Sequence, residues 1–542
     1  MDLESASLGN LLLVSFAANL GSFMFGYDFG AASWLISWFE NYDGDDSLTY
    51  YSIIGDSDNL IGLVGASALF GAVATYFMLL LYGNHISKRD ELLIAAVLYF
   101  CGALIESLSV YLSWADSTGF TVLIIGRWVY GAGMATSMHS STLYSVTMSP
   151  KELRGTVGAT TEVMISLGIL SSYIVGYLNS SSTGWTVIFR VGYILAFAMG
   201  CVVFFLPHLP VHLARTGHSD EDILSSLRTI FPLASLHDVG HVRESIRVAE
   251  KEHQYWMTTN ENYEKKKQTI FWTYFYPLLS EELRVFVTDR ANRYSFYLIN
   301  LLVMTMPLSG LVALMYYANT IFSYLGVVKI DACVVGLGCI KVISATLLLF
   351  MADALERRVF ILFGQMFMMM GLVSLIVGYQ YSVTWLAVTG AYIAVFGYEM
   401  SLGTFAWILI SELFPDFVCS AANSIAVANL LCLNGILNFI LPFILNYIGI
   451  VSLFSFFVCV TVFQFIVVFL YLPNTRGVPI EMAYKLVVVR VRRANRYYFG
   501  CCCSSSSSSS DDDDVDDDHD PSRDMVGDMS NIDEEYLALI AD

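Results

Sequence analysis

The sequence is poor in charged residues: Asp, Glu, Lys and Arg make up only 14% of its 542 residues. Soluble globular domains carry about 25%, so this composition excludes a soluble enzyme, a disordered chain and a nucleic-acid-binding protein. Proline (11) and cysteine (10) are also scarce, which excludes collagen-like chains and disulfide scaffolds. The sequence has no phosphate-binding loop, metal-ligand spacing or nucleophile pattern. We therefore expect no catalytic residue, no metal and no cofactor.

The net charge of −20 is confined to two stretches of the chain. Residues 511–542 contain fourteen Asp or Glu and one Arg, which gives −13, and residues 39–59 add six acids without a base. The remainder is nearly neutral, and hydrophobic residues make up 56% of the whole chain. Such an apolar body is typical of a protein that lies within a lipid bilayer.

Twelve segments are apolar and long enough to cross a bilayer, which takes about 20 residues. They lie near 10–38, 60–82, 92–114, 120–148, 155–178, 185–206, 294–318, 331–354, 359–379, 383–410, 420–447 and 450–471. We therefore predict an all-α membrane protein with twelve transmembrane helices. A short segment, 1–9, precedes six spans (10–206); a polar helical linker, 207–293, leads to six more (294–471); and a tail, 472–542, ends the chain.

The positions of Lys and Arg predict the orientation. Basic residues gather in the loops after the second, fourth and eighth spans, in the linker and at the start of the tail. All of these lie on one side of the membrane, so we expect both termini to be cytosolic. The start of the chain, MDLESASLGN, lacks the basic region of a cleavable signal peptide.

Related motifs appear in the two halves. The loop Asn84–Arg89 corresponds to Asp353–Arg358, and each ends in two bases. The fourth span carries Gly126-Arg127, Gly131 and Gly133 and leads to Arg154-Gly155; the tenth carries Trp407 and leads to Ser411-Glu412-Leu-Phe-Pro415. With Gly26-Tyr27-Asp28 in the first span, these motifs resemble the sugar porter family (sugar and inositol transporters) of the major facilitator superfamily, over most of 20–480.

The resemblance implies a fold of two six-helix bundles with a substrate site between them, and transport of a hexose or polyol by alternating access. It also implies an inner gate of charged residues at the cytosolic helix ends: Arg89, Arg154, Arg357, Arg358 and Glu412. The chain departs from the family pattern around this gate. Asn84 replaces Asp, Ser87 and Glu356 replace Gly, Thr147 replaces Glu and Cys419 replaces Arg, so the expected set of ion pairs is thinner than usual.

Ionisable groups at membrane depth are costly and indicate function. Six are present: Asp28, Glu106, Arg127, Glu162, Lys341 and Glu399. The resemblance implies that Asp28 and Arg127 face each other within the N-terminal bundle. A carboxylate beside a guanidinium keeps its charge, whereas one that is separated and desolvated takes up a proton. We therefore hypothesise that Asp28 carries a coupled proton and that Arg127 modulates it; a permanent structural ion pair is the alternative.

The substrate site is where the resemblance weakens. Sugar porters usually have amides in the seventh span where this chain has Met306, Pro307 and Val312. Two further amide positions hold Glu162 and Lys341. In one interpretation the two pair across the space between the bundles and bind hydroxyls jointly; in the other, each attracts one end of a charged or zwitterionic solute. An unpaired charge there would be costly, which favours the pair. Trp407 and Asn434 match the family as a ring-stacking platform and an amide. Glu399 also matches, near the inner end of the tenth span, as a candidate for gating or coupling.

Glu162 and Lys341 leave other functions open. The same fold could move a charged or zwitterionic organic solute, or act as a nutrient sensor that transports nothing. In the tail, bases from Arg490 to Arg496 favour anionic lipid and precede a Cys-, Ser- and Asp-rich stretch typical of disorder. The pattern from Glu535 to Ile540 resembles an acidic dileucine signal that a sorting adaptor binds. The expected location is the plasma membrane or an endosomal or vacuolar membrane.

Overall fold

The computed structural model describes residues 7–40, 57–82, 86–109, 111, 116–150, 153–179, 184–248, 251, 290–351, 356–414, 416–473, 486, 487 and 490. Chain contacts divide the protein into two units, residues 1–493 and 494–542. Everything described belongs to the first unit. The cysteine, serine and aspartate stretch and the dileucine pattern at Glu535–Ile540 lie outside the described residues.

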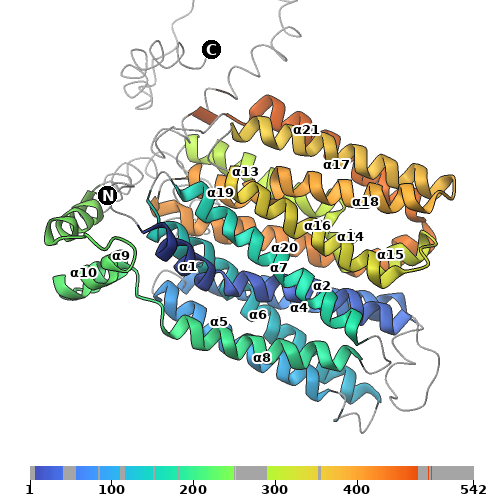
Figure 1. Ribbon diagram of the computed structural model, residues 1–542, viewed down its shortest axis with the longest axis horizontal. Helices are drawn as coiled ribbons and strands as arrows, with labels where there is room; N and C mark the ends of the chain where they lie inside the picture. The colour runs from blue at the N-terminus through green and yellow to red at the C-terminus, as the bar shows by residue number, and fades with distance from the viewer. Residues whose placement is uncertain are drawn as a thin grey trace, which may run out of the picture. The chain divides into compact units, whose positions relative to one another are not determined.

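The first half of the chain folds into a bundle of long helices (Figure 1). They are α1 (Leu8–Ala18), α2 (Leu20–Glu40), α4 (Asp58–Tyr82), α5 (Lys88–Leu108), α6 (Asp116–Met148), α7 (Arg154–Leu178) and α8 (Gly184–Phe204). We call this set the N-bundle.

The second half forms the C-bundle. Its helices are α13 (Arg290–Leu308), α14 (Leu311–Tyr316), α15 (Ala318–Tyr324), α16 (Ile330–Met351), α17 (Arg357–Gln380), α18 (Thr384–Tyr398), the π-helix η5 (Glu399–Gly403), α19 (Thr404–Glu412), α20 (Asp416–Tyr447) and α21 (Ile450–Tyr471). The described residues contain no strand. The all-α prediction is therefore confirmed.

Ten of the described helices are long and apolar enough to cross a membrane, and the bent pair α1 and α2 makes an eleventh span. The remaining predicted span, the fourth, is α6, which has 33 residues. It is less apolar because it carries buried polar side chains such as Arg127, His139 and Ser140. With α6, the helices account for the twelve spans that the sequence predicts.

The first span is bent where α1 meets α2, by 46°. Asn19 lies between the two helices and is fully buried. Its side-chain nitrogen donates to Ser145 on α6 (3.2 Å) and Thr160 on α7 (2.8 Å), and its oxygen accepts from Thr161 (3.1 Å). The helical backbone bonds Asn19 N–H to Ser15 and Phe23 N–H to Asn19 persist across the bend, and the side-chain bonds tie this point of the span to α6 and α7.

The seventh span is broken, contrary to the expectation of one continuous helix over 294–318. Helix α13 ends just after Pro307, and Gly310 has a φ of +94° before α14 begins. Proline cannot donate a backbone hydrogen bond, and this φ suits glycine. A side chain at Gly310 would also lie 2.3 Å from the Phe457 ring. The tenth span is likewise interrupted by η5, where Ser401 leaves helical geometry.

The two bundles meet along pairs of helices, one from each half. In the first pair, α4 lies against α20 so closely that a Cβ on Gly62 would be 2.2 Å from the Phe439 carbonyl oxygen. In the second pair, α7 packs on α16, with Gly338 against Leu170 and Tyr173. Small residues at such crossings let helices approach in lipid, where there is no hydrophobic force between them.

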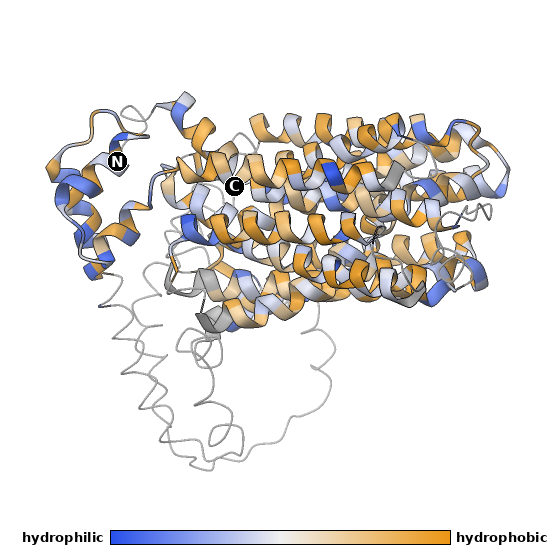
Figure 2. Cartoon of the chain, turned by 90° about the horizontal axis from the view of Figure 1, so that it is seen from below, coloured by the Kyte–Doolittle hydropathy of each residue, from blue (hydrophilic) through white to orange (hydrophobic). Residues whose placement is uncertain are grey.

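Between the halves, the linker forms short helices: α9 (Pro210–Arg215), α10 (Asp220–Arg228) and a helix over 236–248. The Ser219 side chain caps α10 by accepting from the Asp222 backbone N–H at 3.2 Å. Figure 2 shows that hydrophilic residues gather on these short helices, whereas apolar residues cover the long ones. Exposed Phe77, Phe197 and Phe350 illustrate the apolar surface that lipid would cover.

The closest helix crossings generate a prediction about glycine. A Cβ on Gly131 of α6 would lie 1.9 Å from the Ala68 carbonyl oxygen of α4, and backbone cannot move aside. We expect Gly131→Ala to destabilise the protein by about 1–3 kcal/mol, the usual cost of overpacking. A Cβ on Gly200 meets only the Ala96 Cβ at 3.5 Å, so Gly200→Ala is the matched control. Unfolding midpoints in detergent measure both; equal stability of the two variants would contradict the prediction.

Candidate functional site

A buried ion pair lies in the N-bundle between α2 and α6. The Arg127 guanidinium donates to both oxygens of the Asp28 carboxylate: Nη1 donates to Oδ1, and Nη2 donates to Oδ2 at 3.1 Å. Arg127 is fully buried and Asp28 is 2% exposed. This bidentate geometry is the strong form of such a pair. The two residues that the sequence singles out for proton coupling are thus brought into direct contact.

Glu106 on α5 is a third member of this site. Its Oε1 lies 3.8 Å from Arg127 Nη1, and neither of its oxygens has a hydrogen-bond partner among the described residues. The site therefore holds two carboxyl groups around one guanidinium, all buried. Glu106 is recognisable in the sequence as an intramembrane acid, but only the packing of α5 on α6 shows what it faces.

A second cluster of charges joins the two bundles. It consists of Glu162, Lys341 and Glu399, and we call it the bridging triad. Lys341 on α16 donates to Glu162 Oε1 on α7 at 2.7 Å, and it also donates to Glu399 Oε1 on η5. Trp407 on α19 donates from its indole nitrogen to Glu162 Oε2 at 3.1 Å. All four side chains are buried. The predicted pairing of Glu162 with Lys341 is present in the structure.

The position of Glu399 differs from its expected place near the inner end of the tenth span. The span covers 384–410, and Glu399 lies at the break between α18 and α19. The π-helix turns its fully buried side chain towards Lys341, whose ammonium also lies 5.8 Å from the centre of the Tyr398 ring. Sequence periodicity assumes a regular helix, so it cannot place a residue that lies on a π-helical turn.

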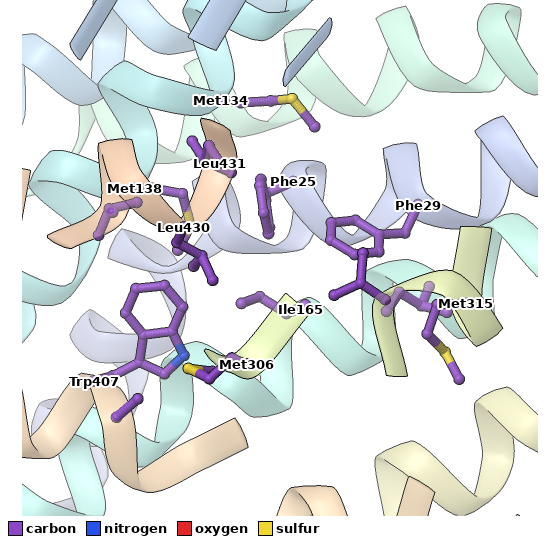
Figure 3. Close-up of a cluster of buried hydrophobic side chains, with 14 of the residues drawn as sticks. Phe25, Phe29, Met134, Met138, Ile165, Met306, Met315, Trp407, Leu430 and Leu431 are labelled. Atoms are coloured by element: carbon purple, nitrogen blue, oxygen red, sulfur yellow. The ribbon is translucent and has the colours of Figure 1, made fainter. Parts of the chain in front are cut away.

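Apolar side chains from both bundles meet in a cluster that includes Trp407, the residue that donates to Glu162 (Figure 3). The labelled members are Phe25, Phe29, Met134, Met138 and Ile165 from the N-bundle, and Met306, Met315, Trp407, Leu430 and Leu431 from the C-bundle. Val312 is also buried in this core. Asn434 on α20 is 1% exposed, and its side-chain oxygen has no hydrogen-bond partner among the described residues. It is therefore free to accept a hydrogen bond.

The predicted inner-gate residues are only partly described. Arg89 donates to the Phe204 carbonyl and lies 5.9 Å from that ring; Arg358 makes the same two contacts with Phe469, at 5.4 Å. Each arginine therefore ties the start of one helix to the end of the last helix of its own bundle. Arg357 is 9% exposed. The side chains of Arg154 and Glu412 lie outside the described residues.

Arg89 also donates to His208 Nε2, at 2.6 Å. His208 lies in the linker just after α8. The pKa of His208 is held below its usual value, mainly by partial burial and secondly by the positive charge of Arg89. The imidazole is therefore neutral at pH 7 and can accept the hydrogen bond from Arg89.

A polar cluster at the start of α5 in the N-bundle is not evident from the sequence. Glu91 accepts from Lys88 at 2.9 Å, and its other oxygen lies 2.9 Å from Nδ1 of His139 on α6. Glu91 and His139 are each 1% exposed. In the sequence, Glu91 stands in a charged run at the start of a span and is indistinguishable from a solvated helix end. Its burial comes from the crossing of α5 and α6.

Comparison with known proteins places the chain in a wide family. The family model described as "Sugar (and other) transporter" matches residues 14–486. A D-xylose-proton symporter-like protein of Arabidopsis thaliana is 26% identical over 485 residues, covering 88% of this chain and 82% of its own. The arabinose-proton symporter of Bacillus subtilis is 23% identical over 499 residues, covering 89% of this chain and 96% of its own.

Solved structures show the same fold. The proton:xylose symporter XylE of the major facilitator superfamily, bound to 6-bromo-6-deoxy-D-glucose, has a TM-score of 0.70 and 21% identity, over 88% of this chain and 99% of its own. A partially occluded, inward-open form of XylE from E. coli has a TM-score of 0.67 and 21% identity, over 86% and 99%. The twelve-helix major facilitator fold that the sequence predicts is confirmed.

The bridging triad generates a stability prediction. In Lys341→Met two buried carboxylates lose their shared cation, so we expect a loss of about 3–5 kcal/mol, the usual cost of breaking a buried pair. Replacing all three charges together, as Glu162→Gln, Lys341→Met and Glu399→Gln, leaves no unpaired charge and should recover most of that stability. Denaturation in detergent measures the difference.

The matched control for the stability prediction is Lys329→Met, because Lys329 is an exposed lysine just before α16. It should leave the denaturation midpoint unchanged. A Lys341→Met protein as stable as the wild type, or a triple variant no more stable than the single one, would show that uncompensated buried charge does not cause the loss of stability.

Proposed function

The chain belongs to the sugar (and other) transporter family, and from this premise we propose that it moves a hexose or related polyol across a membrane by alternating access, coupled to protons. The family and the relatives named above are transporters, among them proton symporters of xylose and arabinose. The chain is thus an integral, multi-pass membrane protein. The finer statements below concern which residues perform the transport.

The observation that carries the proton coupling is the bidentate contact of Arg127 with Asp28, which is fully enclosed in the N-bundle. Held in this way, the carboxylate keeps its charge, because the guanidinium lies against both oxygens. A change in helix packing that withdraws Arg127 leaves a desolvated carboxylate, which takes up a proton. Glu106 beside Arg127 offers the guanidinium a second partner during that exchange. Asp28 then carries the proton and Arg127 controls its release.

The proposed substrate site lies where the two bundles meet. Trp407 offers a ring for stacking, Asn434 a free amide oxygen, and Glu162 and Lys341 charged groups for hydroxyls. The apolar side chains of Figure 3 suit the carbon faces of a sugar ring. Arg89 and Arg358, at helix ends, would act in the inner gate with Arg154, Arg357 and Glu412.

The bridging triad favours a second candidate function, transport of a charged or zwitterionic organic solute. With all three groups ionised, Glu162, Lys341 and Glu399 carry a net charge of −1 in a buried position. A cationic group on the solute would balance that charge. Competition by hexoses against amino acids and organic ions in an uptake assay separates this function from sugar transport.

For the location, we favour cytosolic termini in the plasma membrane or in an endosomal or vacuolar membrane. The argument for orientation is the distribution of Lys and Arg among the loops. In this arrangement the linker helices α9 and α10 face the cytosol. A sorting adaptor at Glu535–Ile540 and lipid contacts of the basic segment remain predictions from the sequence.

Proton coupling through Asp28 predicts a measurable loss of accumulation. In liposomes with a gradient of about one pH unit, each coupled proton supports up to about tenfold accumulation of solute. We therefore expect Asp28→Asn to lower the steady-state accumulation of radiolabelled D-xylose and D-glucose by about tenfold. Counterflow exchange, which needs no net proton movement, should persist.

The matched control is Asp220→Asn, because Asp220 is an exposed aspartate on α10 that pairs with Arg243 outside the bundles. It should accumulate sugar as the wild type does. If Asp28→Asn accumulates sugar to the wild-type level under the same gradient, Asp28 carries no coupled proton. If the wild type takes up neither sugar, the proposed function itself is wrong.

A further inference from the structure

The hydrogen bonds of Glu162 are unevenly distributed between the bundles. Glu162 belongs to α7 of the N-bundle, yet both of its carboxylate bonds in the described structure come from the C-bundle, from Lys341 and from Trp407. Lys341 differs in this respect, because its second partner, Glu399, lies on its own bundle. When the bundles separate, Lys341 therefore keeps an opposite charge and Glu162 keeps none of its present partners.

Alternating access requires the two bundles to separate at the contact between α7 and α16. Helix α7 packs directly on α16, and Glu162 and Lys341 lie in the middle parts of these two helices. A solute that passes between the bundles must break the contact that joins them. The bridging triad is such a contact, because its 2.7 Å bond closes the space between Glu162 and Lys341.

Separation of the bundles divides the charges of the bridging triad unequally. The C-bundle keeps Lys341 with Glu399, which together are neutral when both are ionised. The N-bundle keeps a carboxylate that is 4% exposed in the joined state and lies at membrane depth. Once the sugar fills this space and excludes bulk water, an unpaired charge there is costly, and a carboxylate avoids that cost by accepting a proton. The other titratable groups that face Glu162, namely Lys341, Glu399 and Tyr398, all belong to the C-bundle and leave with it.

We propose that Glu162 binds a second coupled proton, separate from that of Asp28, when the sugar enters between the bundles. This inference rests on the proposed transport function. The proton comes from water on the side where sugar loads, and it converts the carboxylate to a neutral carboxyl group. On the other side the sugar leaves, the Lys341 ammonium and the Trp407 N–H return to the carboxylate, and the proton passes to water. The protein then carries two protons per sugar.

The two proton sites differ in what controls them. Asp28 and its partner Arg127 lie on α2 and α6 of the same bundle, so their contact changes only with packing inside the N-bundle. Glu162 responds to the distance between bundles, and hence directly to the solute. Binding of sugar and binding of the second proton therefore favour each other, by thermodynamic linkage.

A cycle of variants tests the second proton. The readout is the steady-state accumulation of radiolabelled D-xylose or D-glucose in liposomes, which does not depend on the rate of transport. At about one pH unit and zero membrane potential, two protons support about hundredfold accumulation and one supports about tenfold. We expect the wild type near the first level, and Asp28→Asn and Glu162→Gln each near the second. The double variant should show no accumulation above equilibrium.

The Glu162→Gln substitution is suited to this test because it leaves Lys341 paired with Glu399 and creates no unpaired charge. Its amide can still accept from Trp407. Glu221→Gln, an exposed glutamate on α10, is the matched control and should accumulate sugar as the wild type does. Wild-type accumulation by Glu162→Gln would overturn the second proton while leaving Asp28 and the proposed function intact. A wild type that accumulates neither sugar would overturn both.

Infrared spectroscopy tests the protonation of Glu162 without a transport assay. Addition of D-xylose or D-glucose to the purified wild type should produce the band of a newly protonated carboxyl group. The band should persist in Asp28→Asn, where Asp28 cannot contribute to it. In that background it should disappear when Glu162→Gln is added and return, shifted, when Glu162→Asp is added instead. If the band survives in the double variant Asp28→Asn and Glu162→Gln, another group takes the proton. If D-glucosamine binds at least about tenfold tighter than D-glucose and no band forms, Glu162 takes the ammonium group of a solute instead, and the proposal is wrong.

Discussion

The structure depends on one constraint: a charge that is buried at membrane depth needs an opposite charge beside it. Arg127, fully enclosed between helices, holds Asp28 with two hydrogen bonds and has Glu106 nearby. Lys341 holds Glu162 and Glu399 in the same way. Each site has one cation and two carboxyl groups. With all three groups ionised, each site would carry a net charge of −1 at membrane depth, an imbalance that the uptake of one proton removes.

The two sites depend on different contacts: one on packing inside a single bundle, the other on packing between the bundles. The Asp28 site lies wholly on helices of the N-bundle, whereas the Glu162 bonds cross to the C-bundle. If two nearly rigid bundles rock against each other, the bonds of Glu162 to the C-bundle break directly. The contact between Asp28 and Arg127 changes only when helices shift within the N-bundle. The helix breaks at Gly310 and Ser401 lie in the C-bundle, in the seventh and tenth spans. Broken helices of this kind let side chains such as Glu399 leave regular register.

The repeat in the sequence has a physical counterpart at the starts of α5 and α17. Arg89 and Arg358 occupy related loops, and each contacts the backbone and ring of a phenylalanine near the end of the sixth or twelfth span. The contact therefore closes each bundle on itself. Between the bundles the closest approaches are made by glycines and neighbouring backbone, as at Gly62. Contacts of this kind within each half, with a small charged bridge between the halves, suit two bodies that separate and rejoin.

The sequence by itself determined the spans, the two halves, the family and the identity of the ionisable residues at membrane depth, because hydropathy and motif order are local properties of the chain. It also indicated that Glu162 and Lys341 would pair, since an isolated charge there would be costly. Only the tertiary structure decided that Glu399 joins them, that Glu106 borders Arg127 and that Glu91 is buried against His139. These contacts join residues far apart in the chain. They depend on a π-helical turn and on close helix crossings, and neither leaves a periodic signal in the sequence.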